Sequence, residues 1–386
     1  MKTLRAAVVG AGHLGRFHAQ KLARLEGVEL VAVVDPVEAR RNVVAAECHA
    51  QPLADHRPLV DRIDAAVIAT PTQFHHSVAL ELLDRGIHLF VEKPLCATAA
   101  EADELVRAAQ RRGVVLQVGH IERFNPALDP IRAELSDPKY IEAVRAAPFS
   151  FRSTDIGVVL DLMIHDIDLV LSIVRSRVRK VDALGLSVLG AHEDVANARL
   201  EFQCGCVAVL SASRVSCEAV RRMQIWTPRA FAAVDFAART STLVRPDAAL
   251  VDRRLDLASL AAQDPEQRAQ RLEALLPRQQ RQCEPVDALL LELNDFVESI
   301  RGRGTAAPGC VGTAAPGGVG TAALGCSGEQ GRDAVALAER ILAKIAAHAW
   351  DDQPDGLVGP LAIPRPSVLP APHWQMAGGR TRREAG

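Results

Sequence analysis

The sequence GAGHLG at residues 10–15 follows directly on a short apolar stretch, residues 4–9, which is typical of a buried β-strand. Residues 14–26 are predicted to form a helix and residues 28–34 a second strand, which ends next to Asp35. A G-x-G-x-x-G sequence alone is a weak signal. The strand, the glycine turn, the helix and the acid at this spacing together predict a dinucleotide-binding βαβ unit.

The glycines of this turn have separate tasks in such a unit. Gly10 permits the tight turn, and Gly12 lets backbone N–H groups approach a pyrophosphate at the positive end of the helix dipole. Gly15 allows the helix to pack closely on the strand. Cofactor contacts in this half of the unit are therefore predicted at Gly10, Gly12, His13, Leu14, Gly15 and Asp35.

Asp35 also indicates which dinucleotide is bound. Its carboxylate is expected to accept hydrogen bonds from both ribose hydroxyls of the adenosine, and its charge would repel a 2′-phosphate. NAD is therefore favoured over NADP. Arg40 and Arg41 follow closely and leave NADP open, because their guanidinium groups could hold that phosphate.

Strand and helix segments continue to alternate up to residue 119, and strands that are apolar throughout indicate a parallel sheet covered on both faces. Residues 1–122 are therefore predicted to form one doubly wound α/β domain, a Rossmann domain. Its further strands are expected at residues 64–70, 87–92 and 114–119, and its further helices at residues 73–85 and 98–112.

Polar residues follow two of these strands at their carboxyl ends, where ligands of open parallel sheets bind. The nicotinamide half of the cofactor is expected there. Only six of the 45 basic residues are lysines, and one of them is held on extended backbone before Pro94, which points to amine chemistry. An exposed, solvated lysine is the alternative. The predicted contacts of this half are Thr70, Pro71, Thr72, His75, Glu92 and Lys93.

After residue 126 the pattern changes to that of an α+β domain with a largely antiparallel, open sheet. A helix is predicted at residues 156–174, and helices at 286–301 and 330–348 are expected to complete the structure. Because one face of an open sheet must be covered, a homo-oligomer is expected, a dimer or a tetramer. The substrate domain is predicted at residues 123–301 and 329–350, with alternating segments at 180–190, 194–203, 206–215, 220–227 and 230–244.

An eight-residue unit repeats three times between the last two helices, as GTAAPGCV, GTAAPGGV and GTAALGCS at residues 304–327. The repeat carries no charge and no periodic apolar face, so residues 302–328 are predicted to be a flexible surface insertion. Residues 351–386 are rich in proline and are predicted to form a disordered or draped tail.

The sequence DLMIHDID places Asp161, His165 and Asp168 on one side of the predicted apolar helix, because these residues lie four and three positions apart. Buried ionisable groups must be paired or used, since their desolvation is costly. An Asp–His pair that only anchors the helix is the alternative. Arg123 and Asn125 are further candidates for substrate contacts, together with Asp168. Arginine suits a bidentate grip on a diphosphate, and a polar turn before the next helix is the alternative.

The composition argues against several classes of protein. The 45 basic and 47 acidic side chains nearly balance, so nucleic acid is not an expected partner. The apolar stretch at residues 156–174 contains too many charges to span a bilayer, and the N-terminus is predicted to be a strand rather than a signal peptide. The eight cysteines show no CxxC and no metal-ligand spacing. Reduced thiols in a cytoplasmic protein without a metal site are expected.

Three motifs together resemble those of the glucose-fructose oxidoreductase/inositol dehydrogenase (Gfo/Idh/MocA) family: GAGHLG, the EKP of residues 92–94, and the D-x-x-x-H-x-x-D of residues 161–168. A narrower similarity, carried by VGHIERFNP at residues 118–126 and by DLMIHDID, is to the branch that oxidises UDP-N-acetylglucosamine at C3. That branch supplies a 3-keto sugar to an aminotransferase, in some bacteria for the amino sugars of lipid A.

The resemblance implies that Lys93, Asp161 and His165 form the catalytic centre of an NAD-dependent oxidoreductase acting on a sugar hydroxyl. Such a reaction needs a base near neutral pH. Lys93 and His165 both remain candidates for that base, and Asp161 is expected to hold the imidazole. Another nucleotide sugar, a uronate or inositol is the alternative substrate. A non-catalytic NAD-binding sensor is the alternative from another class.

Overall fold

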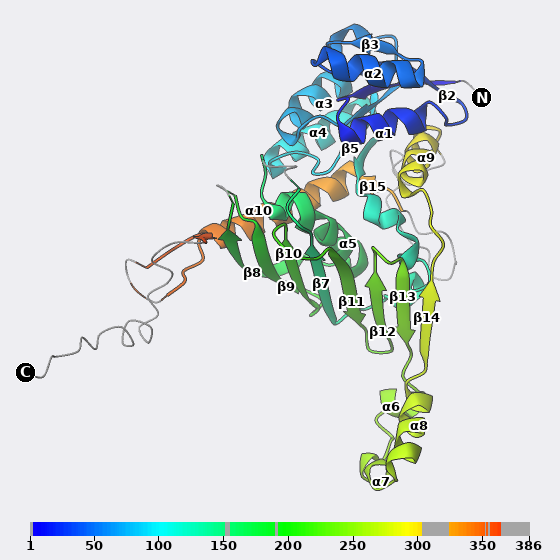
Figure 1. Ribbon diagram of the computed structural model, residues 1–386, viewed down its shortest axis with the longest axis vertical. Coiled ribbons are helices and arrows are strands. Elements are labelled where there is room, and N and C mark those ends of the chain that lie inside the picture. The colour runs from blue at the N-terminus through cyan, green and yellow to red at the C-terminus, as the bar shows by residue number, and fades with distance from the viewer. Residues whose placement is uncertain are drawn as a thin grey trace, which may run out of the picture.

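Two sheets, one of seven strands and one of nine, form the framework of the chain (Figure 1). They are seen in a computed structural model, which describes residues 3–150, 155–189, 192–302, 324–351, 353 and 356–363. The predicted fold class is confirmed, because the first sheet is almost wholly parallel and the second largely antiparallel.

The first sheet has the strand order β15-β6-β5-β4-β1-β2-β3. All neighbours pair in parallel except β15, which runs antiparallel to β6. The order reverses between β1 and β4, and ligands of such sheets bind outside the strand ends at this point. The strands are β1 (Leu4–Val9), β2 (Val28–Val34), β3 (Gln51–Leu53), β4 (Ala65–Ile68), β5 (His88–Glu92), β6 (Leu116–Gly119) and β15 (Cys326–Ser327).

Helices cover both faces of this sheet, as expected for a doubly wound domain. Helices α3 and α4 pack on one face, and α1 and α2 pack on the other. Helix α4 begins with a capping box between Thr98 and Glu101 and ends at Gly113, whose positive φ stops the helix. The helices are α1 (His13–Leu22), α2 (Glu38–Cys48), α3 (His75–Leu83) and α4 (Ala99–Arg112), with short 3-10 turns at Arg57–Leu59 and Thr72–Phe74.

Helix α9 (Ala288–Ile300), which the sequence analysis places in the second domain, packs on the first sheet. Leu293, Phe296 and Val297 are buried in the same core as the residues of β1 and α1. The Phe296 ring meets that of Phe90 on β5, with 5.8 Å between ring centroids. We therefore propose that α9 be counted with the nucleotide-binding domain, because its apolar face completes that core.

The second sheet has the strand order β14-β13-β12-β11-β7-β10-β9-β8-β16. Its pairs are antiparallel except β7 with β10 and β8 with β16. The segment predicted at 230–244 is a hairpin of two strands. The strands are β7 (Tyr140–Ala146), β8 (Val178–Ser187), β9 (Val195–Phe202), β10 (Val207–Ser213), β11 (Val220–Trp226), β12 (Phe231–Asp235), β13 (Thr240–Val244), β14 (Arg278–Gln282) and β16 (Leu361–Ala362).

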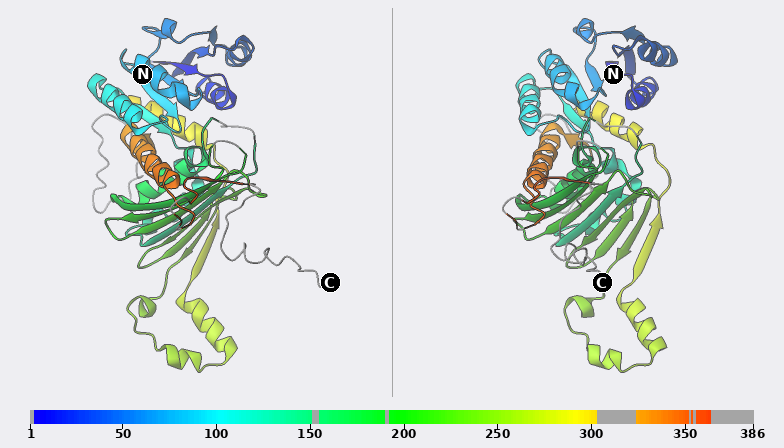
Figure 2. Two further views of the ribbon diagram at one scale, coloured as in Figure 1. Left: turned by 90° about the vertical axis from the view of Figure 1, so that its left-hand side faces the viewer. Right: turned by 60° about the vertical axis from the view of Figure 1, so that its left-hand side comes forward.

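One face of the second sheet carries the core, and the other is half exposed. A π-helical turn, η6 (Val159–Met163), continues into α5 (Ile164–Val174), and both pack on the inner face with α10 (Gly328–Ala346). Helix α10 also contacts α4 and β6, so it joins the two domains, as Figure 2 shows. Short 3-10 turns lie between the two sheets at η3 (Ile121–Phe124), η4 (Pro126–Leu128) and η5 (Arg132–Glu134).

Three short helices, α6 (Ala248–Val251), α7 (Leu257–Ala261) and α8 (Pro265–Leu275), form an arm between β13 and β14. The arm projects away from the sheets in every view (Figures 1 and 2). Its helices leave several apolar side chains exposed, among them Leu257 and Leu272.

Most of the predicted insertion and tail, residues 303–323 and 364–386, lies outside the described residues. The end of the third repeat unit is described, and it is part of the fold. Cys326 and Ser327 form β15 beside β6, and Ser327 makes a capping box with Gln330 at the start of α10. The insertion predicted at residues 302–328 therefore does not include Cys326, Ser327 or Gly328. We propose that it ends at or before residue 325.

Candidate active site

The glycine turn after β1 has the shape that a dinucleotide needs. Gly10 has a φ of +101°, and a Cβ there would lie 2.6 Å from the Ala69 carbonyl oxygen. A Cβ on Gly15 would lie 1.7 Å from the Gly10 carbonyl oxygen, so both positions require glycine. A Cβ on Gly12 would meet nothing within 4 Å. Gly12 therefore leaves open the space that a pyrophosphate would occupy at the start of α1.

The residues around this turn fit NAD. Asp35 is buried, and its carboxylate accepts hydrogen bonds from the backbone N–H groups of Ala11 and Val37, both at 2.8 Å. The carboxylate is thus fixed beside the glycine turn, where an adenosine ribose would lie. Arg41 donates to the Pro36 carbonyl at 3.1 Å. The remaining predicted contacts of this half, His13 and Leu14, are exposed on the first turn of α1.

The strand ends that were predicted to meet the nicotinamide are tied together by His75. Its Nε2 lies 2.8 Å from the Thr70 carbonyl oxygen and its Nδ1 lies 2.9 Å from that of Pro94. Burial lowers the pKa of His75, although the two carbonyls act in the opposite direction. A neutral imidazole has one N–H, so His75 donates to one of these carbonyls and packs against the other, between the ends of β4 and β5. Thr70 Oγ1 is buried and has no hydrogen-bond partner among the described residues, and it lies beside Pro71 and Thr72.

Glu92 supports the lysine that follows it. One carboxylate oxygen lies 2.6 Å from His18 Nε2, and the other accepts the Lys93 backbone N–H at 3.2 Å. Burial acts to raise the pKa of Glu92, but the contacts with His18 and Lys93 outweigh burial and lower the pKa. The carboxylate is therefore ionised and pairs with His18, so its predicted contact with the cofactor gains no direct support.

Lys93 of the first domain and Asp161 of the second are in contact. Lys93 Nζ donates to the Asp161 backbone oxygen at 2.6 Å and to its carboxylate at 3.2 Å. Both side chains remain partly exposed, at 15% and 18%. Asp161 lies in the π-helical turn η6, a type of turn that is frequent at functional sites. A cavity of about 240 Å³ opens beside this contact, and its lining includes Leu14, Thr70, Pro71, Thr72, His75, Glu92, Lys93, Asp155 and Asp161.

His165 lies one helical turn beyond Asp161, but its ring has a different neighbour from the one predicted. The Asp161 carboxylate is engaged by Lys93, and His165 Nδ1 is buried without a hydrogen-bond partner among the described residues. The ring stands edge-on to that of His120, with 6.2 Å between centroids and 90° between planes. Burial, followed by the charges of Lys93 and Arg145, lowers the pKa of His165 well below 6.5. His165 is therefore neutral at neutral pH and can accept a proton.

Arg123 and Asp168 contact each other, which corrects their predicted role in holding substrate. Arg123 Nε and Nη2 donate to the two Asp168 oxygens at 2.7 and 2.6 Å. Arg123 Nη1 donates to the Gly325 carbonyl and to Gln330 Oε1. Because both side chains are almost fully buried and four donors are engaged, this arginine holds η3, α5 and the start of α10 together. It is not free to grip a diphosphate.

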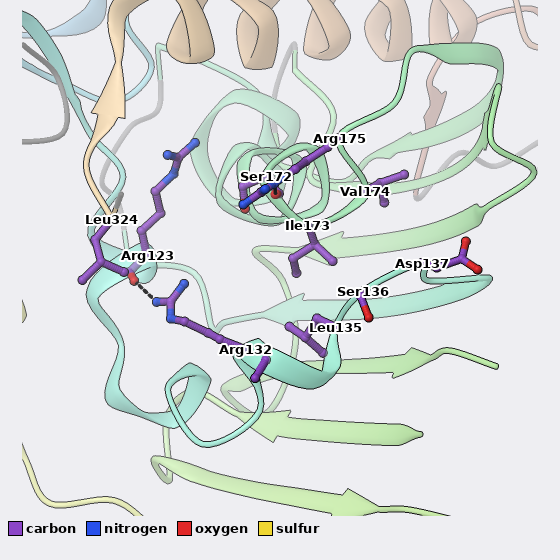
Figure 3. A pocket seen from close by; sticks show the side chains of 11 residues that line it. Arg123, Arg132, Leu135, Ser136, Asp137, Ser172, Ile173, Val174, Arg175 and Leu324 are labelled. Carbon is purple, nitrogen blue, oxygen red and sulfur yellow. Dashed lines mark hydrogen bonds between the residues drawn. The ribbon is translucent and has the colours of Figure 1, made fainter. Parts of the chain in front are cut away.

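A second cavity, of about 390 Å³, lies beside Arg123 (Figure 3). Arg132 reaches the Arg123 backbone carbonyl there, and Ser172 and Arg175 lie on the opposite wall. This cavity shares no residue with the one beside Lys93. Arg123 therefore lines a cavity that is distinct from the one beside Lys93.

Asn125 is likewise engaged in the fold. Its Nδ2 donates to Glu122 and to the Phe236 carbonyl, both at 3.1 Å. Its Oδ1 accepts the Ala127 N–H at 3.1 Å and so caps η4. The alternative of a polar turn before the next helix explains this residue better than a substrate contact does.

Among the described residues, His120, Asp168 and Cys326 place ligand-type atoms within 4.8 Å of one another. Asp168 is already neutralised there by Arg123. Burial raises the pKa of the Cys326 thiol, which therefore stays protonated. We assign no metal to this group, because the Arg123 guanidinium already supplies the positive charge beside the Asp168 carboxylate.

Three buried groups near the site were not predicted from the sequence. His18 lies on α1 and faces Glu92, His120 directly follows β6, and Arg145 on β7 pairs with Glu122 and Asp166. The rule that strand ends carry functional residues could have found His120, since β6 is the strand next to β5. No comparable signal marks Arg145, whose charge interrupts an otherwise ordinary strand.

Comparisons with known proteins agree with this geometry. A family model described as an oxidoreductase family with an NAD-binding Rossmann fold matches residues 4–120, and the GFO/IDH/MocA C-terminal domain matches residues 131–230. The UDP-N-acetylglucosamine 3-dehydrogenase of Acidithiobacillus ferrooxidans is 42% identical over 265 residues, 66% of this chain and 83% of the relative. The scyllo-inositol 2-dehydrogenase of Bacillus subtilis is 31% identical over 55% of this chain and 68% of the relative.

Solved structures show the same likeness. A structure of the Acidithiobacillus ferrooxidans enzyme has a TM-score of 0.73 at 33% identity and covers 89% of this chain and 98% of its own. Levoglucosan dehydrogenase in complex with NADH has a TM-score of 0.70 at 16% identity, over 88% of this chain and 96% of its own. The second likeness shows the fold alone. No helix among the described residues is both long and apolar enough to cross a membrane.

Proposed function

The chain belongs to the GFO/IDH/MocA family of NAD-binding oxidoreductases, and from this premise we propose that it oxidises the C3 hydroxyl of UDP-N-acetylglucosamine to a ketone with NAD. The 3-keto product is the electrophile that an aminotransferase needs, so the reaction suits the synthesis of a diamino sugar. The relative at 42% identity supports the choice of substrate. The contact of Lys93 with Asp161, beside the cavity, carries the proposal of catalysis.

NAD, when bound, accepts the hydride that leaves the sugar carbon. The residues suited to hold it are the glycine turn, with its open side at Gly12, and the Asp35 carboxylate. A carboxylate at this position disfavours a 2′-phosphate. Thr70 Oγ1, which has no partner among the described residues, is a further donor or acceptor for the cofactor.

The hydroxyl proton must leave as the hydride does, and two groups of this chain share the task. We assign proton acceptance to His165, because its lowered pKa leaves the imidazole unprotonated at neutral pH, with a ring nitrogen free to accept a proton. Lys93 already donates hydrogen bonds to Asp161, and we assign it the role of donor to the sugar oxygen. Asp161 then orients the lysine rather than the imidazole.

We also propose that the enzyme is a homo-oligomer of the cytoplasm. Five side chains in register cross the outer face of the second sheet and are only partly covered: Val207, Tyr140, Trp226, Phe231 and Val244. A second copy would cover this strip. The seven cysteines within the described residues are free thiols, which supports a reducing compartment.

The test is to follow NADH absorbance while purified protein and NAD are mixed with UDP-N-acetylglucosamine, UDP-N-acetylglucosaminuronate or inositol. We expect the first sugar to give the highest kcat/KM. The proposal is overturned if another of the three is preferred or if none is oxidised. Size-exclusion chromatography with light scattering tests the oligomer, and an exclusively monomeric protein would refute that part.

A further inference from the structure

His165 Nδ1 is a buried polar atom without a hydrogen-bond partner among the described residues. Such atoms are rare in folded proteins, because leaving them unpaired is costly. The predicted partner, Asp161, holds Lys93 instead. Since the partner of one ring nitrogen decides which tautomer is present, the group that serves Nδ1 also decides whether Nε2 is free to act as a base.

His120 is the neighbour that can serve this nitrogen. Its ring is 1% exposed and stands perpendicular to that of His165. Its own Nδ1 also lacks a hydrogen-bond partner among the described residues. Gly119, which precedes it, is the register partner of Glu92, so His120 lies beside Lys93 at the same edge of the first sheet. The two domains therefore meet in two side-by-side pairs, Lys93 with Asp161 and His120 with His165.

A fixed carboxylate lies behind His120. His120 Nδ1 is 3.9 Å from Asp168 Oδ2. That carboxylate cannot turn away, because Arg123 holds both of its oxygens. Arg123 is in turn anchored to Gln330 on α10. A carboxylate that accepts from one imidazole nitrogen fixes the ring and makes the other nitrogen a better acceptor.

We propose that His120 is the positioning residue of His165. Its Nδ1–H points to Asp168, and its Nε2 accepts the Nδ1–H of His165, so that His165 presents a free Nε2 to the sugar hydroxyl. This inference rests on the proposed function. In the oxidation the hydroxyl O–H bond breaks and an N–H bond forms at His165 Nε2. The resulting imidazolium charge is stabilised through His120 by the Asp168 carboxylate.

The distance of 3.9 Å from His120 Nδ1 to Asp168 is longer than a hydrogen bond, and Nδ1 of His165 has no partner among the described residues. Long contacts of this kind are common at catalytic sites before substrate binds. We expect them to shorten in the substrate complex. His120 lies between the other two groups at the domain boundary, with its ring edge-on to that of His165 and its Nδ1 3.9 Å from Asp168.

Burial keeps both imidazoles neutral, as this arrangement requires. Burial lowers the pKa of each ring. The groups that face His165 and lower its pKa are Lys93, Arg145, His120 and Arg221. Of the groups that face His120, Arg123 and Lys93 lower its pKa, whereas Asp168 and Glu92 raise it. A neutral His120 can donate to Asp168 and accept from His165 at the same time, whereas a protonated His120 could only donate.

The test compares His120→Phe, which keeps a ring but no nitrogen, with His120→Gln, whose amide can both donate and accept. We expect H120F to lower kcat by about 10- to 100-fold, as is typical when a supporting hydrogen-bond partner is removed. The KM for the sugar and the Kd for NAD should stay close to wild type. H120Q should recover part of the loss. His88→Gln is the matched control, because His88 lies at the opposite end of β5 and accepts only the Val115 N–H.

The direct readout is the pKa of His165, measured by NMR with labelled histidine on the substrate-free protein. Loss of the acceptor destabilises the imidazolium, so H120F should lower this pKa and move the acid limb of kcat/KM to lower pH. A His165 pKa that is unchanged in H120F overturns the inference. If H120F does not fold, His120→Leu replaces it. Because the titration needs no substrate, it stays decisive even if the wild type oxidises none of the sugars and the proposed function fails.

Discussion

Two pairs of opposite charge lie near the boundary of the two domains, Lys93 with Asp161 and Arg123 with Asp168, and they differ in what surrounds them. Lys93 and Asp161 lie beside an open cavity and keep 15% and 18% of their side-chain surface exposed. Arg123 and Asp168 are 6% and 1% exposed, and the guanidinium has four of its donors engaged. Both pairs come from motifs that predict function. A cavity also lies beside Arg123, so the two pairs differ in side-chain exposure and in free hydrogen-bonding capacity rather than in the presence of a cavity.

The largest expected effect is on kcat, which should depend on Lys93 of the first pair. Lys93→Ala removes the donor to the sugar hydroxyl, and positioned acid–base groups typically contribute about 10²- to 10⁴-fold. We expect kcat to fall by that factor while the Kd for NAD, measured by fluorescence, stays unchanged. Lys21→Ala is the control, since Lys21 also pairs with a carboxylate, Asp287, but on the surface. Equal turnover of the two variants would contradict the role of Lys93.

The second effect is on the free energy of unfolding, which should depend on the pair of Arg123 with Asp168. Arg123→Met leaves the Asp168 carboxylate buried without its cation, and breaking such a pair typically costs about 3–5 kcal/mol. Urea unfolding should show this loss. Arg16→Met removes an exposed pair with Glu47 and should cost less than about 1 kcal/mol. If R123M is as stable as R16M but binds the nucleotide sugar poorly, Arg123 serves the substrate after all.

The pH dependence of stability should identify the same pair. Burial acts to raise the pKa of Asp168, but Arg123 and His120 outweigh burial and hold the pKa below 3.8. A lowered folded-state pKa contributes stability above the unfolded value, and this stability is lost as the pH falls through the folded value. The free energy of unfolding should therefore decline below about pH 4. Asp168→Asn should flatten that part of the curve, and an unaltered slope would speak against the assignment.

The extent to which these features can be predicted differs between local and distant contacts. GAGHLG and the strand-end position of Lys93 are encoded within a few residues, and the fold places both as expected. Asp168 and Gln330, which bind the Arg123 guanidinium, lie 45 and 207 residues away in the sequence. No local pattern predicts these contacts. The short strand β3 and the strand β7, with its buried Arg145, also depend on neighbours that the local pattern does not reveal.

The smallest expected effect concerns Asn125, at the edge of the Arg123 region. Asn125→Ala removes the cap of η4 and should cost about 1 kcal/mol of stability. The KM for the sugar should stay within about twofold of wild type, since the amide is engaged by Glu122 and Phe236. A large increase in KM at unchanged stability would return Asn125 to the substrate site.

The crystal structure of the complex with NADH and UDP-N-acetylglucosamine tests the central claim most directly. The account predicts that Lys93 Nζ and His165 Nε2 both lie within hydrogen-bond distance of the C3 hydroxyl oxygen, with Arg123 still bound to Asp168. A sugar whose diphosphate lies on Arg123, with its C3 hydroxyl remote from Lys93, would contradict it.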